Sequence, residues 1–98
     1  AVVALNDLIA ADVIRAARIC GKQVPEDFSV IGFDNVSLSA SLDPPLTTVA
    51  SPLHEIGQVA AESILGQIEQ GGSVKPVQNY QLYLPMSLII RQSCSGLT

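Results

Sequence analysis

Two polar residues, Asn6 and Asp34, have the types and spacing that could bind a ligand. Each directly follows an apolar run, residues 1–5 and 28–33 respectively, of the kind that forms a parallel strand covered on both faces. Ligands bind outside the carboxyl ends of such strands, so we expect both side chains on one rim of a sheet. An amide beside a carboxylate suits a polyhydroxylated ligand. The same residues are also ordinary cap and turn residues, and spacing alone leaves both interpretations open.

The neighbouring acidic residues have simpler interpretations. We expect Asp7 to cap the helix that follows, because its later position turns it toward that helix. The pair His54–Glu55 lies in the first turn of a predicted helix, where the helix dipole favours Glu. A phosphoacceptor role for Asp34 would need acidic companions and a strand-end Lys, and the sequence lacks both.

The sequence predicts no enzyme, no catalytic residue and no cofactor. It contains no G-x-S-x-G, H-E-x-x-H, P-loop or G-x-G-x-x-G motif. Cys20 and Cys94 stand apart from each other, and His54 is the one histidine, so we expect no metal site and no disulfide. We expect two reduced thiols that mostly pack, in a cytoplasmic protein.

Composition limits the possible partners. The 98 residues are 48% hydrophobic and carry five Lys and Arg against nine Asp and Glu, with no run of either sign. Nucleic-acid affinity needs clustered basic residues, so this segment is not expected to touch DNA itself. No membrane-length apolar stretch and no signal peptide occur, so no membrane partner is expected.

The elements that must position Asn6 and Asp34 form a βαβ unit. Between the two strands, a helix is predicted from residue 7 to about residue 20, closed by Gly21. Such a crossover makes the strands parallel. The predicted buried face of the helix consists of Ile9, Val13, Ala16, Ala17 and Cys20.

The second half of the chain supplies another helix and one or two strands. Residues 36–43 predict an irregular connection with room for one helical turn, and residues 46–49 a brief extended stretch. Ser51–Pro52 begins a helix that Gly71–Gly72 ends. Residues 80–90 alternate with period two, which predicts a strand interrupted at Pro85, before a frayed tail over 93–98.

The chain is expected to be a fragment. A 98-residue chain leaves little stability margin without a partner or more chain. It also opens at Ala1 on what reads as the middle of a buried strand.

Several motifs, in the same order along the chain, resemble the C-terminal third of LacI/GalR-type bacterial transcription regulators. Each motif alone also occurs in other proteins, but their combination is specific for this family, and together they cover nearly the whole chain. Departures are Asp12, where relatives often carry a small or apolar residue, and Gly21-Lys-Gln, which replaces a Gly-apolar pair. The matching segments are Asn6-Asp-Leu-Ile-Ala, Val24-Pro-Glu-Asp-Phe-Ser-Val-Ile-Gly-Phe-Asp-Asn35, Pro44-Pro-Leu-Thr-Thr-Val49, a Gly57-bearing helix and Leu84-Pro-Met-Ser-Leu-Ile-Ile-Arg91.

The resemblance implies an α/β fold, a fragment of a two-lobed, type I periplasmic-binding-protein-like domain with its effector between the lobes. Residues 1–46 and 86–98 would belong mainly to the C-terminal lobe, and residues 50–84 mainly to the N-terminal lobe. The effector would be a sugar or a nucleoside-like molecule. Asn6 and Asp34 fall on effector-contacting positions, and Leu53 on a variable position that could form an apolar wall.

The resemblance also implies a hinge and a homodimer. The chain would cross between the lobes at Thr47, Thr48 and Val49, and again near Pro85. The dimer interface would include the helix strip with Leu8 and Ala11 and the connection with Leu42.

The resulting hypothesis is the effector-sensing, dimerising part of a transcription regulator, which contacts DNA only through a missing N-terminal domain. One alternative is a sugar-binding component of a transport system with the same fold. Another is an α/β interaction domain without a small ligand.

Overall fold

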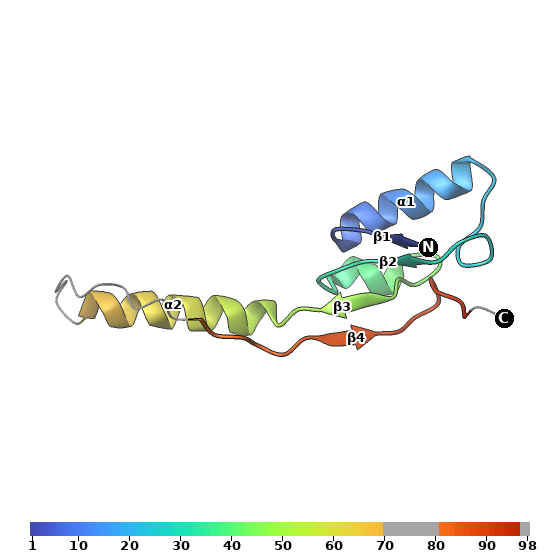
Figure 1. The fold of residues 1–98 in the computed structure, drawn as a ribbon. Coiled ribbons are helices and arrows are strands. Elements are labelled where there is room, and N and C mark those ends of the chain that lie inside the picture. The colour runs from blue at the N-terminus through green and yellow to red at the C-terminus, as the bar shows by residue number, and fades with distance from the viewer. Residues whose placement is uncertain (70–80, 97–98) are drawn as a thin grey trace. The chain divides into compact units, whose positions relative to one another are not determined.

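The computed structural model describes residues 1–69 and 81–96, and it confirms the α/β class (Figure 1). The chain forms two compact units, Ala1–Ser51 with Met86–Thr98, and Pro52–Pro85. The elements in chain order are β1 (Val2–Val3), α1 (Asp7–Ile19), β2 (Val30–Ile31), the 3-10 helix η1 (Ser37–Ser41), β3 (Thr48–Ala50), α2 (Leu53–Glu69) and β4 (Ser87–Ile89).

The first unit contains the predicted βαβ unit. β1 and β2 are parallel, with Val2 opposite Val30, and α1 is the crossover between them (Figure 1). The backbone beyond β2 continues in parallel beside β3, because the amide of Gly32 donates to the carbonyl of Thr47 at 2.9 Å. β3 and β4 then pair antiparallel, with Val49 opposite Leu88. The extended segments therefore lie in the order β1, β2, β3, β4.

The core lies between α1 and these strands, but the helix face differs from the prediction. The buried apolar residues of α1 are Ala10, Ile14 and Ala17, which pack with Ala4, Val24, Val30 and Leu46. Ile9 and Ala16 are exposed, so the predicted face is displaced by about one residue. The shift follows from Asp7, a polar residue that the prediction left out of the buried face. Asp7 is buried, and residues 7, 10, 14 and 17 share one face of the helix.

The ends of α1 follow the expected chemistry, whereas its cysteine does not. Gly21 has φ of +70°, the left-handed conformation that closes a helix, and the next amide, that of Lys22, donates to Ala17 at 2.8 Å. Cys20 is exposed and Cys94 half-buried, so the expected packing role is wrong for Cys20.

The second unit consists, among its described residues, of α2 and an extended segment. None of the 17 residues of α2 is buried, so its apolar stripe, with Ile56, Ile64 and Ile68, is exposed. The predicted end of this helix at Gly71–Gly72 and the start of the alternating run at Tyr80 lie outside the described residues. No helix within 1–69 or 81–96 has the length and apolarity that crossing a membrane requires.

The alternating run from residue 81 forms a strand only at its end. Residues 81–86 pair with no strand in the described part of the chain, and β4 begins after Pro85. The strand prediction is therefore wrong for 81–86. An alternating pattern is compatible with an extended backbone, but a ladder also needs a partner strand and an amide hydrogen, which proline lacks.

Candidate functional site

Asn6 and Asp34 lie on the same rim of the first unit. The amide of Ala4 donates to the carbonyl of Ile31 at 2.9 Å, and the amide of Asp7 donates to the carbonyl of Phe33 at 3.1 Å. The parallel pairing thus continues to the point where both strands end. Both side chains are half-buried at this carboxyl-end rim, where parallel sheets bind ligands.

Asn6 is the N-cap of α1. Its backbone is extended, with φ of −152°, and its Oδ1 accepts from the amide of Ile9 at 2.9 Å. The capping interaction uses the oxygen of the side chain, and the amide nitrogen donates to none of the described residues. A cap and a ligand donor are therefore compatible roles for this one side chain.

Asp34 begins a turn with an unusual backbone. Asp34 and Asn35 have φ of 103° and 57°, a region that residues other than glycine rarely adopt. Such conformations cost about 1 to 3 kcal/mol each and concentrate where a ligand is bound. The carboxylate of Asp34 accepts one long hydrogen bond, from Ser51 Oγ at 3.4 Å, which leaves acceptor sites unused.

The strained turn is held by hydrogen bonds at every residue. The amide of Asp34 donates to the carbonyl of Val49 at 2.8 Å, and that of Val36 donates to Asp7 Oδ2 at 2.8 Å. Between them, Asn35 Oδ1 accepts from Arg91 Nη2 at 2.9 Å. The surrounding structure therefore fixes this backbone conformation, and with it the direction in which Asp34 leaves the sheet.

Asp7 supports the rim from inside the core. Asp7 is 1% exposed, and its carboxylate accepts from Thr48 Oγ1 at 2.6 Å as well as from the amide of Val36. The expectation that Asp7 caps α1 is wrong, because Asn6 is the cap and Asp7 points inward. Gly32 makes room for it, since a Cβ there would meet Asp7 Oδ1 and would approach Leu46 Cδ2 to 2.8 Å.

Two further residues of this network, Arg91 and Ser93, were missed by the sequence analysis. Ser93 is fully buried, accepts from the amide of Thr47 at 2.8 Å and donates to the carbonyl of Val30 at 2.6 Å. The expected fraying is therefore wrong for residues 93–95, while residues 97–98 lie outside the described part. Gly32 was a usable signal for the inward position of Asp7, since glycine inside a strand marks a close approach of neighbouring groups, but it does not indicate Arg91 or Ser93.

The predicted hinge residues and Leu53 are divided between the two units. Among the hinge residues, Thr47 and Thr48 are buried and Val49 half-buried in the first unit, whereas Pro85 is exposed in the second. Leu53 is exposed on α2, where it lines a shallow hollow with His54, Gly57 and Gln58. Their hinge and ligand roles stay predictions.

The predicted dimer contacts have mixed exposure. Leu8 is 60% exposed on α1, and Ala11 is half-buried. Leu42 is half-buried and packs against the core. Their contact with a second copy stays a prediction.

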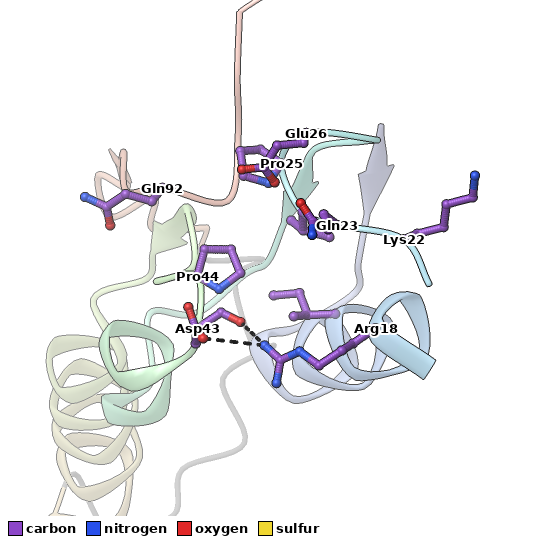
Figure 2. Close-up of a pocket in the computed structure, with 10 residues that line it drawn as sticks. Arg18, Lys22, Gln23, Pro25, Glu26, Asp43, Pro44 and Gln92 are labelled. Atoms are coloured by element: carbon purple, nitrogen blue, oxygen red, sulfur yellow. Dashed lines mark hydrogen bonds and ion pairs between the residues drawn. The ribbon is translucent and has the colours of Figure 1, made fainter. Parts of the chain in front are cut away.

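A hollow of about 430 Å³ lies at the opposite end of the parallel strands (Figure 2). Its lining includes residues 22–26, which precede β2, and Asp43–Pro44, which precede β3. Arg18 lies at its edge and donates to the carbonyl of Asp43 at 2.7 Å, with the carboxylate 3.7 Å away. This hollow is at the amino ends of the strands, so it is separate from the rim of Asn6 and Asp34.

Within residues 1–69 and 81–96, no group of three or more His, Cys, Asp or Glu side chains could hold a metal ion. His54 and Glu55 are both exposed on α2. The polar groups at the rim are the amide of Asn6 and the carboxylate of Asp34.

Comparisons with known proteins point to one group. A model of the periplasmic binding protein-like domain family matches residues 1–94. The chain is 36% identical over 93 residues to a ribose operon repressor of Halalkalibacterium halodurans, which covers 95% of the chain and 27% of the repressor. It is 44% identical over 96 residues to the HTH-type transcriptional regulator MalR of Streptomyces coelicolor, again 27% of that protein.

Solved structures give the same result. The chain resembles a LacI family transcriptional regulator from Enterococcus faecalis with bound ribose, with a TM-score of 0.84, 39% identity, and coverage of 98% of this chain and 34% of that one. It also resembles the lac repressor dimer bound to operator and an anti-inducer, with a TM-score of 0.80, 33% identity, and coverage of 96% and 31%. The chain thus spans about a quarter to a third of the length of these proteins.

Proposed function

Because this chain belongs to the periplasmic binding protein-like domain family, we propose that it is the C-terminal, effector-sensing part of a LacI-type transcriptional regulator. The observation that carries the proposal is the shared rim of Asn6 and Asp34, with its fixed, strained turn. The rim supplies an amide and a carboxylate with unused hydrogen-bonding capacity, which is what the hydroxyl groups of a sugar require.

The proposed effector is a sugar, and D-ribose is the first to test. Two similar regulators were solved with bound ribose, and two similar proteins are ribose operon repressors. Asp34 would accept from sugar hydroxyls, Asn6 would donate from its amide nitrogen, and Leu53 would supply an apolar wall. Upstream residues would complete the pocket.

The proposed mechanism is a ligand-dependent choice between two arrangements of the lobes. Residues 1–46 and 86–98 would belong to the C-terminal lobe and residues 50–84 to the N-terminal lobe, with the chain crossing at 47–49 and again near Pro85. A sugar shifts this equilibrium only by its different affinity for the two arrangements.

The proposed working form is a cytoplasmic homodimer without enzymatic activity. Leu8, with its exposed side chain on α1, supports the dimer contact, together with Ala11 and Leu42. A similar structure is that of a lac repressor dimer on its operator. DNA would be contacted only by a domain that is not part of this chain.

The test begins with the full regulator that carries this chain. Its thermal unfolding is followed with D-ribose, D-galactose, maltose, cellobiose and adenosine, since a ligand of the native state raises the midpoint. Affinity of the active sugar is then measured by calorimetry for the wild type, Asp34→Ala and the control Asp43→Ala, whose side chain is 96% exposed at the other end of the strands.

Asp34→Ala should weaken sugar binding by about 10- to 150-fold, the effect of losing a hydrogen bond to a charged group. Asp43→Ala should leave the affinity unchanged. No response to any sugar, or equal affinities for wild type and Asp34→Ala, would reject the proposal. Binding of the sugar without any binding to operator DNA would favour the transport alternative.

A further inference from the structure

Arg91 lies where the turn of Asp34 meets two other segments. It follows β4, and its half-buried guanidinium donates three hydrogen bonds. Nη1 donates to Ser39 Oγ at 2.9 Å and to the carbonyl of Leu46 at 2.8 Å, and Nη2 donates to Asn35 Oδ1 at 2.9 Å. The amide of Arg91 donates to Thr47 Oγ1 at 2.9 Å, which fixes its backbone too.

The acceptor Asn35 is the second residue of the strained turn. Its φ of 57° belongs to the left-handed region, which asparagine tolerates better than most residues but does not prefer. Asn35 Oδ1 accepts from Ser39 Oγ as well as from Arg91, at 3.2 Å and 2.9 Å. The shorter of these hydrogen bonds is charge-assisted and therefore the stronger. The guanidinium is thus the main restraint on the Asn35 side chain, whereas Asp7 and Thr48 hold the backbone amides of Val36 and Asn35.

Asp34 depends on this restraint because its own contacts are few. Its backbone is held at φ of 103°, and its carboxylate makes only the 3.4 Å contact with Ser51. Release of the Asn35 side chain would leave the turn held only by the amides of Asp34, Asn35 and Val36, and the direction of the Asp34 carboxylate would then be less firmly fixed.

We propose that Arg91 is a positioning residue for effector binding: it clamps Asn35 and so holds the Asp34 carboxylate toward the ligand. This inference rests on the proposed function of the rim. The planar guanidinium reaches Asn35, Ser39 and Leu46 at once, which a lysine ammonium on a flexible stem does not reproduce.

The first measurement needs no ligand. Hydrogen exchange of the full regulator is followed by mass spectrometry for wild type, Arg91→Lys, Arg91→Ala and the control Arg18→Ala, whose exposed side chain lies on α1. Peptides covering residues 33–37 should exchange about tenfold faster in both Arg91 variants, because a hydrogen bond to a charged group is lost there. Peptides covering residues 10–17 of α1 should not change.

The second measurement is the affinity for D-ribose. Arg91→Lys should weaken binding by about tenfold or more if the clamp is worth a charge-assisted hydrogen bond. In the Asp34→Ala background, the same change should weaken binding by less than about twofold, because contacting groups that act through one another are not additive. A purely structural arginine would not show this dependence on Asp34.

Four results separate the possibilities. Unchanged exchange over residues 33–37 in folded Arg91→Lys, or equally faster exchange over 10–17, overturns the inference. A loss of affinity from Arg91→Lys that persists undiminished in the Asp34→Ala background also overturns it. If the wild type does not bind D-ribose, the ribose assignment fails, and the exchange measurement still decides the role of Arg91. If Arg91→Ala does not fold, the exchange and affinity measurements on Arg91→Lys, which retains the positive charge, are sufficient for the test.

Discussion

Replacing Asp7 by alanine should lower the free energy of unfolding by about 3 kcal/mol. The carboxylate is buried and accepts from Thr48 Oγ1 and from the amide of Val36. A hydrogen bond to a charged group contributes about 1.5 to 3 kcal/mol. Two such bonds would together contribute about 3 to 6 kcal/mol to the free energy of unfolding. The hydroxyl of Thr48 can rotate toward another acceptor, whereas the amide of Val36 cannot. The decrease in the free energy of unfolding should therefore lie near the lower end of this range.

Asparagine at position 7 should be much milder, at about 1 kcal/mol. Its Oδ1 can still accept from Val36, and its amide nitrogen can donate to Thr48 Oγ1, because a hydroxyl both donates and accepts. The pair of substitutions therefore separates loss of the hydrogen bonds from loss of the negative charge.

The assay is urea unfolding of the full regulator, followed by far-ultraviolet circular dichroism. A change in the midpoint at constant slope reports a change in stability. Thr48→Val alone and with Asp7→Ala completes a double-mutant cycle, in which a coupling energy of at least about 0.5 kcal/mol is expected for residues in contact. The reasoning would be refuted if Asp7→Ala and Asp7→Asn were equally stable, or if the coupling were zero.

Three further predictions concern single side chains. Gly32→Ala should destabilise the protein by about 1 to 3 kcal/mol in the same urea assay, because the added Cβ would collide with Asp7 and Leu46. The control Gly57→Ala should instead stabilise the protein by about 0.5 to 1 kcal/mol, because Gly57 lies in a helix and a Cβ there would meet no atom within 4 Å. Ser93→Ala should cost about 1 to 3 kcal/mol because a buried amide loses its acceptor, and the exposed Ser95→Ala should change unfolding by less than about 0.5 kcal/mol. Asn6→Asp retains the oxygen that caps α1 but removes the amide donor. Calorimetry should therefore show weaker D-ribose binding, while the midpoint of urea unfolding should not change. If the variant bound D-ribose as tightly as the wild type, Asn6 would not belong to the proposed site.

Local patterns in the sequence were enough to predict the elements near the rim. The parallel strands, the crossover helix and the left-handed Gly21 all follow from periodicity and turn chemistry over a few neighbouring residues. The position of Asn6 and Asp34 at the strand ends follows in turn, since a short βαβ unit has one preferred geometry.

The polar support of the rim could not be predicted from local patterns. Asp7 bonds to Thr48, 41 residues away, and Arg91 bonds to Asn35, 56 residues away. Nothing in the spacing of the chain indicates which distant hydroxyl or amide will meet a carboxylate in the core. The one-residue error in the buried face of α1 has the same origin, because the inward position of Asp7 sets the helix rotation.

The distance in sequence between Val30 and Ser93 also constrains how the protein is made. The first unit is completed only by residues 63 positions beyond β2, when the hydroxyl of Ser93 reaches the carbonyl of Val30. During synthesis, strands β1 to β3 are translated before this partner exists. They must therefore wait, with one sheet edge open, while the whole Pro52–Pro85 segment is translated. The sheet of the first unit is therefore completed only after residues 87–93 have been translated.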